Sequence, residues 1–289
     1  MKKIFPYLLL LPALLFTALV LVYPLVQNLI NSFSDVSMIK GNKGWIGLLN
    51  YVHVFEDNLF WLAFKNTSLY AIAGTLLALL IGLGFALLLH IKTSTFNTVA
   101  GFLYTIPWVV SPVVAGFAWK WLLNDHFGIL NHWLAGAGLI RAGTPWLGDP
   151  QTALWCVMVA RIWQFYPFAM VMFLAALHTI PLEQYEAAAV DGASMLRKFY
   201  HITLPNLKSV SSVLLVLGVI WSFNDFNMIF VMTRGGPMNA SMVLSVLVRE
   251  FSFVHFDLGK GSALSILVFL LLISLSSLYL KVLSRRESV

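Results

Sequence analysis

The sequence predicts an all-α polytopic membrane protein with six transmembrane helices and both termini in the cytoplasm. Of its 289 residues, 60% are hydrophobic and 10% are charged, whereas soluble domains carry about 25% charged residues. Several apolar runs reach the length of about 20 residues that a helix needs to cross the roughly 30 Å hydrocarbon core of a bilayer. This composition and these runs are typical of a protein that lies in lipid.

Six such runs predict the membrane spans. The spans are predicted at residues 5–27, 67–90, 100–123, 152–179, 209–232 and 262–282. The first run, preceded by Lys2 and Lys3, also has the charge pattern of a secretory signal peptide. It continues uncharged to Ser34 and has no small-x-small cleavage site in its first half, so we predict a retained span.

The distribution of basic residues predicts the orientation. An even number of spans places both termini on one side. The basic residues on that side are Lys2, Lys3, Lys92, Arg197, Lys198, Lys208, Lys281, Arg285 and Arg286, and those on the other side are Lys40, Lys43, Lys65, Lys120, Arg141, Arg234, Arg249 and Lys260. The first set is the denser one, because it lies in shorter segments. Basic residues next to the spans are concentrated on the cytoplasmic side of a membrane protein, so both termini are predicted to face the cytoplasm.

The basic residues do not indicate nucleic acid as a partner. The net charge of +6 is spread along the chain and forms no Lys/Arg block with interleaved aromatic residues. A single cysteine, Cys156, excludes a disulfide framework or a cysteine-based metal site within one chain. We interpret it as a small apolar residue.

The predicted cytoplasmic loop, residues 181–208, reads as a helix, a bend and a second helix. Pro181 and Glu183 suit a helix start, and the alanines that follow extend this helix to about Val190. Asp191 and Gly192 break it. Ser194 is placed to cap the second helix, which we expect Leu204-Pro205 to close. An amphipathic helix lying in the membrane interface is the alternative.

The loop resembles the EAA loop of binding-protein-dependent ABC importer permeases. The resemblance rests on Glu186-Ala187-Ala188, on Gly192 and on Ile202-x-Leu204-Pro205. It implies the type I importer permease fold in a bacterial inner membrane, with this loop docking on a cytoplasmic ATPase. The residues that it assigns to ATPase coupling are Glu186, Ala187, Ala188, Asp191, Gly192, Ala193, Ile202, Leu204 and Pro205.

A second group of residues resembles the sugar-type permeases of this family. It comprises Phe223-Asn224-Asp225-Phe226-Asn227 and Thr233-x-Gly235-Gly236-Pro237, with Tyr166-Pro167-Phe168 and Leu174-Ala175-Ala176-Leu177 upstream. The Gly-Gly-Pro sequence is similar to the first permease of the maltose and glycerol-phosphate importers. The resemblance implies substrate contacts at Asn224 and Asp225.

The resemblance also implies partner subunits. The partners are a homologous second permease in a heterodimer, two ATPase subunits and an extracytoplasmic solute-binding protein. A Walker loop needs Gly-x-x-x-x-Gly-Lys-Ser/Thr, and the nearest sequence, Gly259-Lys260-Gly261-Ser262, lacks that spacing. We therefore expect ATP and magnesium to bind the ATPase, and this chain to hold no cofactor and catalyse no reaction.

Two charged residues are predicted inside the bilayer. Arg161 in the fourth span and Asp225 in the fifth lie about 15 and 12 Å below the outer surface at about 1.5 Å per residue. Charges at such depth face the bundle interior or a cavity. Antiparallel helices can bring the two together as an ion pair. Alternatively, one or both line the solute path and contact substrate hydroxyls.

Residues at helical spacing predict a sugar-binding face on the fifth span. The face combines an aromatic ring with amide and carboxylate groups, which suit the apolar faces and hydroxyls of a sugar. The predicted substrate-path residues are Arg161, Tyr166, Trp221, Asn224, Asp225, Asn227 and Met228. Helix packing, with Asn joining neighbouring helices, is the alternative. Tyr166-Pro167, Pro107 and Pro112 are candidate helix interruptions along the path.

Other functions have weaker support in the sequence. His90, His178 and His201 lack ligand spacing and are interpreted as interfacial, so we predict no metal site. A secondary transporter driven by an ion gradient would carry an inverted repeat with equivalent carboxylates, whereas Asp225 is the one clear carboxylate within a predicted span. The sequence leaves open whether the solute is a monosaccharide, a disaccharide, an oligosaccharide or glycerol phosphate.

Overall fold

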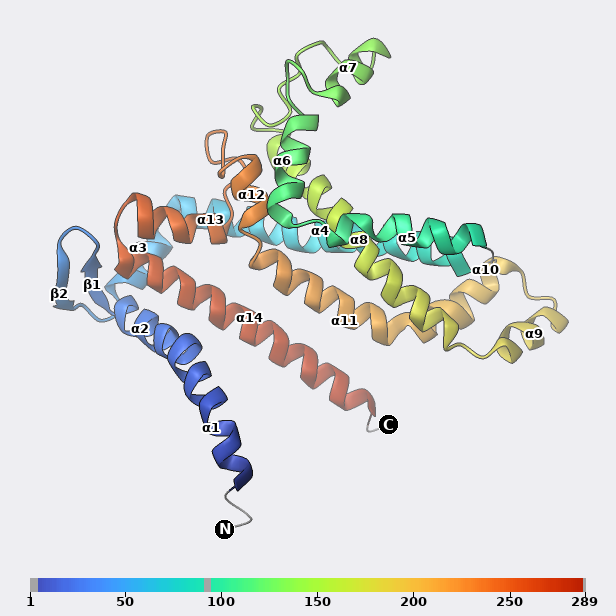
Figure 1. Ribbon diagram of the computed structural model, residues 1–289, viewed down its shortest axis with the longest axis horizontal. Helices are drawn as coiled ribbons and strands as arrows, with labels where there is room; N and C mark the ends of the chain where they lie inside the picture. Colours follow the sequence, from blue (N-terminus) through green and yellow to red (C-terminus); the bar gives the residue numbers. More distant parts are fainter. Residues whose placement is uncertain (1–4, 91–94, 288–289) are drawn as a thin grey trace. The chain divides into compact units, whose positions relative to one another are not determined.

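The computed structural model describes residues 5–90 and 95–287, which form fourteen α-helices, three π-helical turns and one two-stranded sheet (Figure 1). Five of the described helices are long and apolar enough to span a membrane, or six if the bent pair α5 and α6 counts as one span. The predicted helical membrane fold is confirmed. The orientation of the termini stays a prediction, and Lys2, Lys3 and Lys92 lie outside the described residues.

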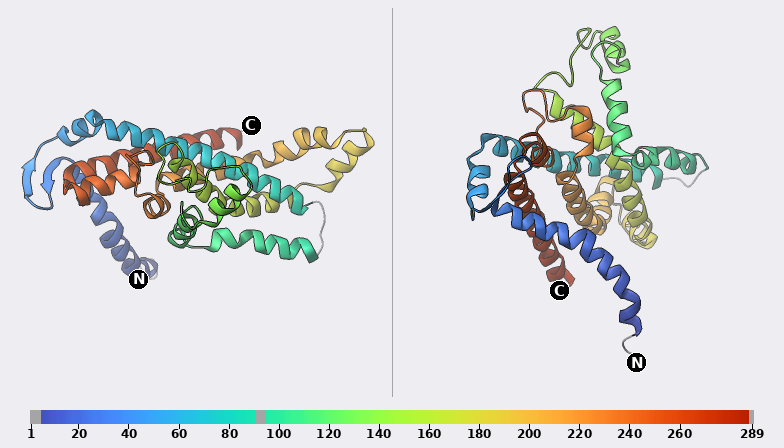
Figure 2. Two further views of the ribbon diagram at one scale, coloured as in Figure 1. Left: turned by 90° about the horizontal axis from the view of Figure 1, so that it is seen from above. Right: turned by 60° about the vertical axis from the view of Figure 1, so that its left-hand side comes forward.

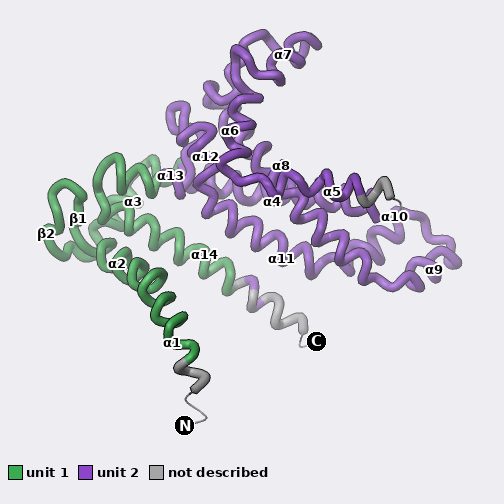
Figure 3. Tube along the Cα trace, in the orientation of Figure 1, with its two compact units in different colours: residues 1–62, 247–278 green, residues 63–246, 279–289 purple. Residues whose placement is uncertain are grey.

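The chain divides into two compact units (Figure 3). Unit 1 contains residues 1–62 and 247–278, and unit 2 contains residues 63–246 and 279–289. The elements of unit 1 are α1 (Phe5–Thr17), the π turn η1 (Ala18–Val22), α2 (Tyr23–Ser32), β1 (Ser34–Ser37), β2 (Gly41–Trp45), α3 (Leu49–Glu56), the start of α4 (Asn58–His90), the end of α13 (Leu244–Arg249), η3 (Glu250–Val254) and α14 (Leu258–Glu287) as far as residue 278. The first helical run thus extends to Ser32, beyond the predicted end at residue 27.

A small antiparallel hairpin, which the sequence did not predict, follows the first span. Strand β1 pairs with β2, and the Phe33 and Trp45 rings stack with centroids 5.1 Å apart. The buried Asn50 amide donates from Nδ2 to the backbone oxygens of Ser32 and Ser34, each at 3.0 Å. These bonds satisfy backbone groups where the helix becomes a strand.

An ion pair joins the start of α4 to α14 within unit 1. Lys260 Nζ lies 2.7 Å from Asp57 Oδ2, and Leu59 donates its N–H to Asp57 Oδ1 at 2.9 Å. Burial raises the pKa of the Asp57 carboxyl, but the bonds from Lys260 and Leu59 outweigh it and hold the pKa below its ordinary value. The carboxylate is therefore the form that stabilises the fold.

Asp57→Asn is expected to lower the free energy of unfolding by about 1–2 kcal/mol at neutral pH. Because the pKa of Asp57 is lower in the folded state, its stabilisation is present above the unfolded pKa of about 3.9 and is lost as the pH falls through the folded pKa. The check is thermal unfolding of both proteins from neutral pH down into the acid range, where the difference between their stabilities should shrink as the pH falls below the unfolded pKa. The control is Asp35→Asn, since Asp35 and Lys43 are exposed and 3.7 Å apart.

Unit 2 contains most of the remaining helices. They are most of α4, α5 (Thr95–Val109), α6 (Pro112–Leu122), α7 (Ile129–Gly136), α8 (Ala153–His178), α9 (Leu182–Val190), α10 (Met195–Lys198), the π turn η2 (Phe199–Thr203), α11 (Leu204–Phe223), α12 (Asn227–Met232) and the start of α13. Helix α8 is the most buried of the candidate spans. Its bounds differ from the predicted 152–179 by one residue at each end.

The third predicted span is bent instead of straight. Helices α5 and α6 meet at an angle of 96°, and Figure 2 shows α6 turning away from α5. Ser111 has an extended backbone with ψ 138°, which is the conformation that a following proline favours. Pro112 then starts α6, whereas Pro107 lies within α5.

Close backbone contact between α4 and α8 depends on Gly82. A Cβ at this position would lie 2.8 Å from Ala169 Cβ and 2.9 Å from the Tyr166 carbonyl oxygen. A Cβ at Gly84, two residues further along α4, would meet nothing within 4 Å. Small residues at such crossings let membrane helices approach closely.

Gly82→Val is therefore expected to destabilise the protein by about 1–3 kcal/mol, because the two helices must separate. Gly84→Val carries the same change in helix propensity and should have little further effect. Melting temperatures of the purified variants measure the difference. Equal destabilisation by both variants would show that the close approach of α4 to α8 does not contribute.

Candidate functional site

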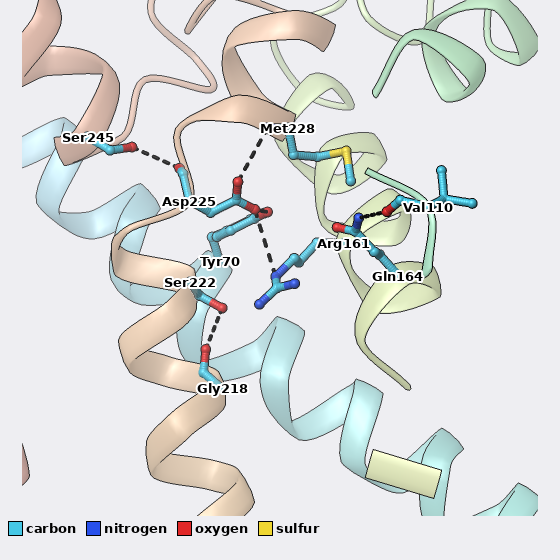
Figure 4. Close-up of polar contacts among 9 residues, drawn as sticks. All are labelled: Tyr70, Val110, Arg161, Gln164, Gly218, Ser222, Asp225, Met228 and Ser245. Atoms are coloured by element: carbon cyan, nitrogen blue, oxygen red, sulfur yellow. Dashed lines mark hydrogen bonds and ion pairs between the residues drawn. The ribbon is translucent and has the colours of Figure 1, made fainter. Parts of the chain in front are cut away.

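A break between α11 and α12 positions Asp225 (Figure 4). Helix α11 ends at Phe223, and α12 starts at Asn227. Asp225 Oδ1 accepts the backbone N–H of Met228 at 3.3 Å, so the carboxylate satisfies a free donor at the start of α12. Ser245 Oγ donates to the Asp225 carbonyl oxygen at 2.8 Å. The break thus holds the carboxylate in one place.

Arg161 of α8 lies beside this carboxylate. Arg161 Nε is 3.8 Å from Asp225 Oδ2, and the side chains are 13% and 11% exposed. At this distance the two groups form an ionic contact and not a hydrogen bond. Arg161 Nε is buried and has no hydrogen-bond partner. The guanidinium also lies 4.9 Å from the centre of the Phe165 ring. The structure therefore brings the two predicted charges together and leaves the Nε–H of Arg161 without an acceptor.

The sequence reasoning missed Tyr70, which makes the shortest contact in the cluster. Tyr70 is fully buried in α4, and its hydroxyl donates to Asp225 Oδ2 at 2.6 Å. One turn earlier, Asn66 Nδ2 donates to the backbone oxygens of Ala240 and Met242, each at 3.0 Å. The spacing of four residues between Asn66 and Tyr70 places both on one face of α4. In the sequence, this spacing was a signal for a row of buried polar side chains.

The expectation that Trp221, Asn224, Asp225 and Met228 share one face of a continuous helix is wrong. Trp221 and Asn224 are exposed near the end of α11, but Met228 lies in a separate helix and is fully buried. Asn224 Nδ2 donates to Ile220 O at 3.0 Å within its own helix. Asn227 is exposed at the start of α12. The break changes the helical register, so Met228 does not share the face of Trp221.

Aromatic rings surround the exposed tryptophan. The Trp221 ring lies 5.9 Å from Phe165 and 5.3 Å from Phe168, measured between centroids. Phe165 is also the ring under Arg161. The aromatic cluster therefore connects the exposed Trp221 to the buried charges.

The predicted interruption at Tyr166-Pro167 is not observed. Helix α8 continues through Pro167, and the Tyr166 ring stacks on Phe85 with centroids 5.2 Å apart. The candidate interruption at Pro112 is observed, at the bend between α5 and α6, where Gln164 Nε2 of α8 donates to Val110 O at 2.9 Å. Gln164 is buried and was also missed, because a single amide in a span does not reveal its partner.

The predicted coupling loop forms a helix, a bend and a second helix. Helix α9 ends at Val190, and Gly192 follows with φ +72°, a conformation that favours glycine. Ser194 caps α10 by accepting the backbone N–H of Arg197 at 3.3 Å. Figures 1 and 2 show the segment projecting from one end of unit 2.

The expected helix end at Leu204-Pro205 is wrong. The helical run continues from Met195 through η2 to Phe223. Pro205 lies in the first turn of α11, a position that tolerates the missing N–H of proline. Of the predicted coupling residues, the exposed ones are Glu186, Ala187, Asp191, Gly192, Leu204 and Pro205, and the half-buried ones are Ala188, Ala193 and Ile202.

The described residues do not assemble a metal site. In the parts of the chain that the structure describes, His, Cys, Asp and Glu side chains form no group of three or more that could hold a metal ion. The chemistry that this arrangement supports is binding: hydrogen bonding by Arg161 and stacking on Trp221.

Comparison with known proteins assigns the family. Residues 78–288 match the model of the binding-protein-dependent transport system inner membrane component. The trehalose/maltose transport system permease protein MalF of Thermococcus litoralis is 35% identical over 96% of this chain and 92% of its own. The sulfoquinovosyl glycerol transport system permease protein SmoG of Agrobacterium fabrum is 33% identical over 99% of this chain and 92% of its own.

A solved structure shows the same fold. A bacterial ABC transporter chain involved in the import of the acidic polysaccharide alginate matches with a TM-score of 0.82 and 22% identity, covering 97% of this chain and 96% of that one. The family and the fold agree, and they support an ATP-driven importer subunit over an ion-gradient-driven transporter. The chain belongs to the family of binding-protein-dependent transport system inner membrane components, the multi-pass permease subunits of ABC importers.

Proposed function

We propose that this permease carries a sugar or a related polar solute inward across the inner membrane. The observation that carries the proposal is the exposed Trp221 and Asn224 at the end of α11, next to the buried cluster of Tyr70, Arg161 and Asp225. An aromatic ring can stack on the apolar face of a saccharide, and neighbouring polar side chains can form hydrogen bonds with its hydroxyls. Relatives named for trehalose/maltose, sulfoquinovosyl glycerol and diacetylchitobiose transport support this substrate class.

The remaining subunits are proposed from the family. This chain pairs with a homologous second permease, receives solute from an extracytoplasmic binding protein and is driven by two ATPase subunits that bind ATP and magnesium. The segment from Glu186 to Pro205 contacts the ATPase. Its exposed residues and the left-handed bend at Gly192 support this role. Asn227 remains a proposed path residue because it is exposed at the break.

Trp221→Ala is expected to lower sugar uptake about tenfold, because it removes the ring on which the saccharide stacks. Trp221→Phe should retain most of the uptake. The measurement is uptake of labelled saccharides and amino acids into proteoliposomes that contain the complete importer. Trp155→Ala is the control, since Trp155 is an exposed tryptophan near the opposite end of α8 from the coupling segment, residues 181–208. Equal uptake by Trp221→Ala and the unchanged protein would contradict the proposed path.

A further inference from the structure

A cavity of about 540 Å³ lies where the coupling segment meets the ends of α4 and α8. All of its described lining residues belong to unit 2. Most of the wall is apolar and is formed by Leu87, Leu177, Leu182, Met195, Leu196 and Phe199. A space with such walls favours an apolar occupant over water.

The polar part of the wall favours an anion. Lys198 supplies a positive charge, and His90 has a buried Nδ1 without a hydrogen-bond partner. Tyr185 and Thr203 also line the cavity, with their hydroxyl oxygens 2.9 Å apart. None of the described residues that line it is acidic. The cavity therefore combines leucine-rich walls with donors that suit a phosphate group.

The position of the cavity identifies where such a ligand comes from. His90 is the last residue of α4, and Leu177 lies in the last turn of α8, so the cavity lies at the level where these spans leave the bilayer. Basic pockets between membrane helices bind anionic lipid head groups.

We propose that this cavity binds one anionic phospholipid from the adjacent leaflet. Part of an acyl chain lies among Leu87, Leu177 and Phe199, and the phosphate lies within reach of Lys198 and His90. Because the walls come from α4, α8, α9, α10 and η2, the lipid braces the coupling segment against two spans. This inference concerns lipid binding and does not depend on the identity of the transported solute.

The test is native mass spectrometry of the complete importer, delipidated and then titrated with phosphatidylglycerol or with phosphatidylcholine of the same chain length. The unchanged complex should retain one phosphatidylglycerol in preference to phosphatidylcholine. Lys198→Gln should weaken this binding about fivefold, the factor that corresponds to about 1 kcal/mol for one lysine near an anionic lipid. Leu87→Trp, which fills the cavity, should abolish it.

Arg197→Gln provides the matched control, because Arg197 is the preceding residue, carries the same charge and does not line the cavity. It should leave the affinity unchanged. Equal weakening by Arg197→Gln and Lys198→Gln would overturn the proposal in favour of general charge attraction. So would equal retention of phosphatidylcholine, displacement of the lipid by millimolar inorganic phosphate alone, or an intact complex that retains no phosphatidylglycerol. Co-elution of all subunits confirms that each variant is assembled.

Discussion

Gly192→Val is expected to reduce ATP-driven uptake and ATPase attachment about tenfold while leaving the membrane spans folded. Gly192 has φ +72°, which a β-branched residue adopts only with strain of about 1–3 kcal/mol. A Cβ there would meet nothing within 4 Å, so the effect comes from the backbone and not from a clash inside this chain. Relief of the strain would reorient α9 relative to α10 and alter the surface proposed to contact the ATPase.

Gly138→Val is the control, because it introduces backbone strain outside the coupling segment. Gly138 has φ +73°, and a Cβ there would meet nothing within 4 Å. It follows α7 and is far along the chain from the coupling segment. The two variants therefore introduce the same backbone strain at different places. Co-purification of the ATPase and uptake by proteoliposomes are the measurements. If Gly138→Val impairs both as strongly as Gly192→Val does, the coupling role of the α9–α10 bend is refuted.

Asp225→Asn is expected to lower the free energy of unfolding by about 3 kcal/mol, because it leaves the buried Arg161 charge without its partner. The amide keeps the shape of the carboxylate, and its oxygen can still accept the Tyr70 hydroxyl. Its NH2 group then faces the Met228 N–H, so the loss combines the lost charge with one lost hydrogen bond. Adding Arg161→Gln removes the orphan charge and should restore at least half of the lost stability. Uptake should stay low in the double variant, since both residues belong to the predicted substrate path.

Thermal unfolding followed by tryptophan fluorescence measures these changes. Ser245→Ala is the control for removing one hydrogen bond at the same break, and it should cost about 1 kcal/mol. Additive losses in the double variant would mean that Arg161 and Asp225 do not stabilise each other. Full uptake by the double variant would place the solute path elsewhere.

The sequence predicted the features that depend on local chemistry. The apolar run of α8 predicts a span whose ends differ by one residue from the observed ones. Gly192 and Ser194 predict a bend and a helix cap because their preferences are set by their own backbone and side chain. The pairing of Arg161 and Asp225 was one of two alternatives, and it followed from their similar depth, since a charge inside the bilayer usually has a partner.

Features set by partners distant in sequence were not predicted. Tyr70 and Gln164 are single polar residues in apolar helices, and their acceptors are 155 and 54 residues away. Pro107, Pro112 and Pro167 were all candidate interruptions, and the sequence did not tell them apart. The 96° bend lies at Pro112, whereas α5 continues through Pro107 and α8 through Pro167, because tertiary packing decides whether a membrane helix breaks at proline. The consecutive turn-forming residues Asn224 and Asp225 were a signal for the break after α11.

ATP-dependent uptake by the purified importer tests the central claim most directly. Proteoliposomes would contain this chain, its partner permease and the ATPase subunits, with binding protein and labelled saccharide outside. Uptake is predicted when hydrolysable ATP is available to the ATPase, and not with a non-hydrolysable analogue or with an ion gradient alone. Accumulation driven by an ion gradient without ATP would contradict the account.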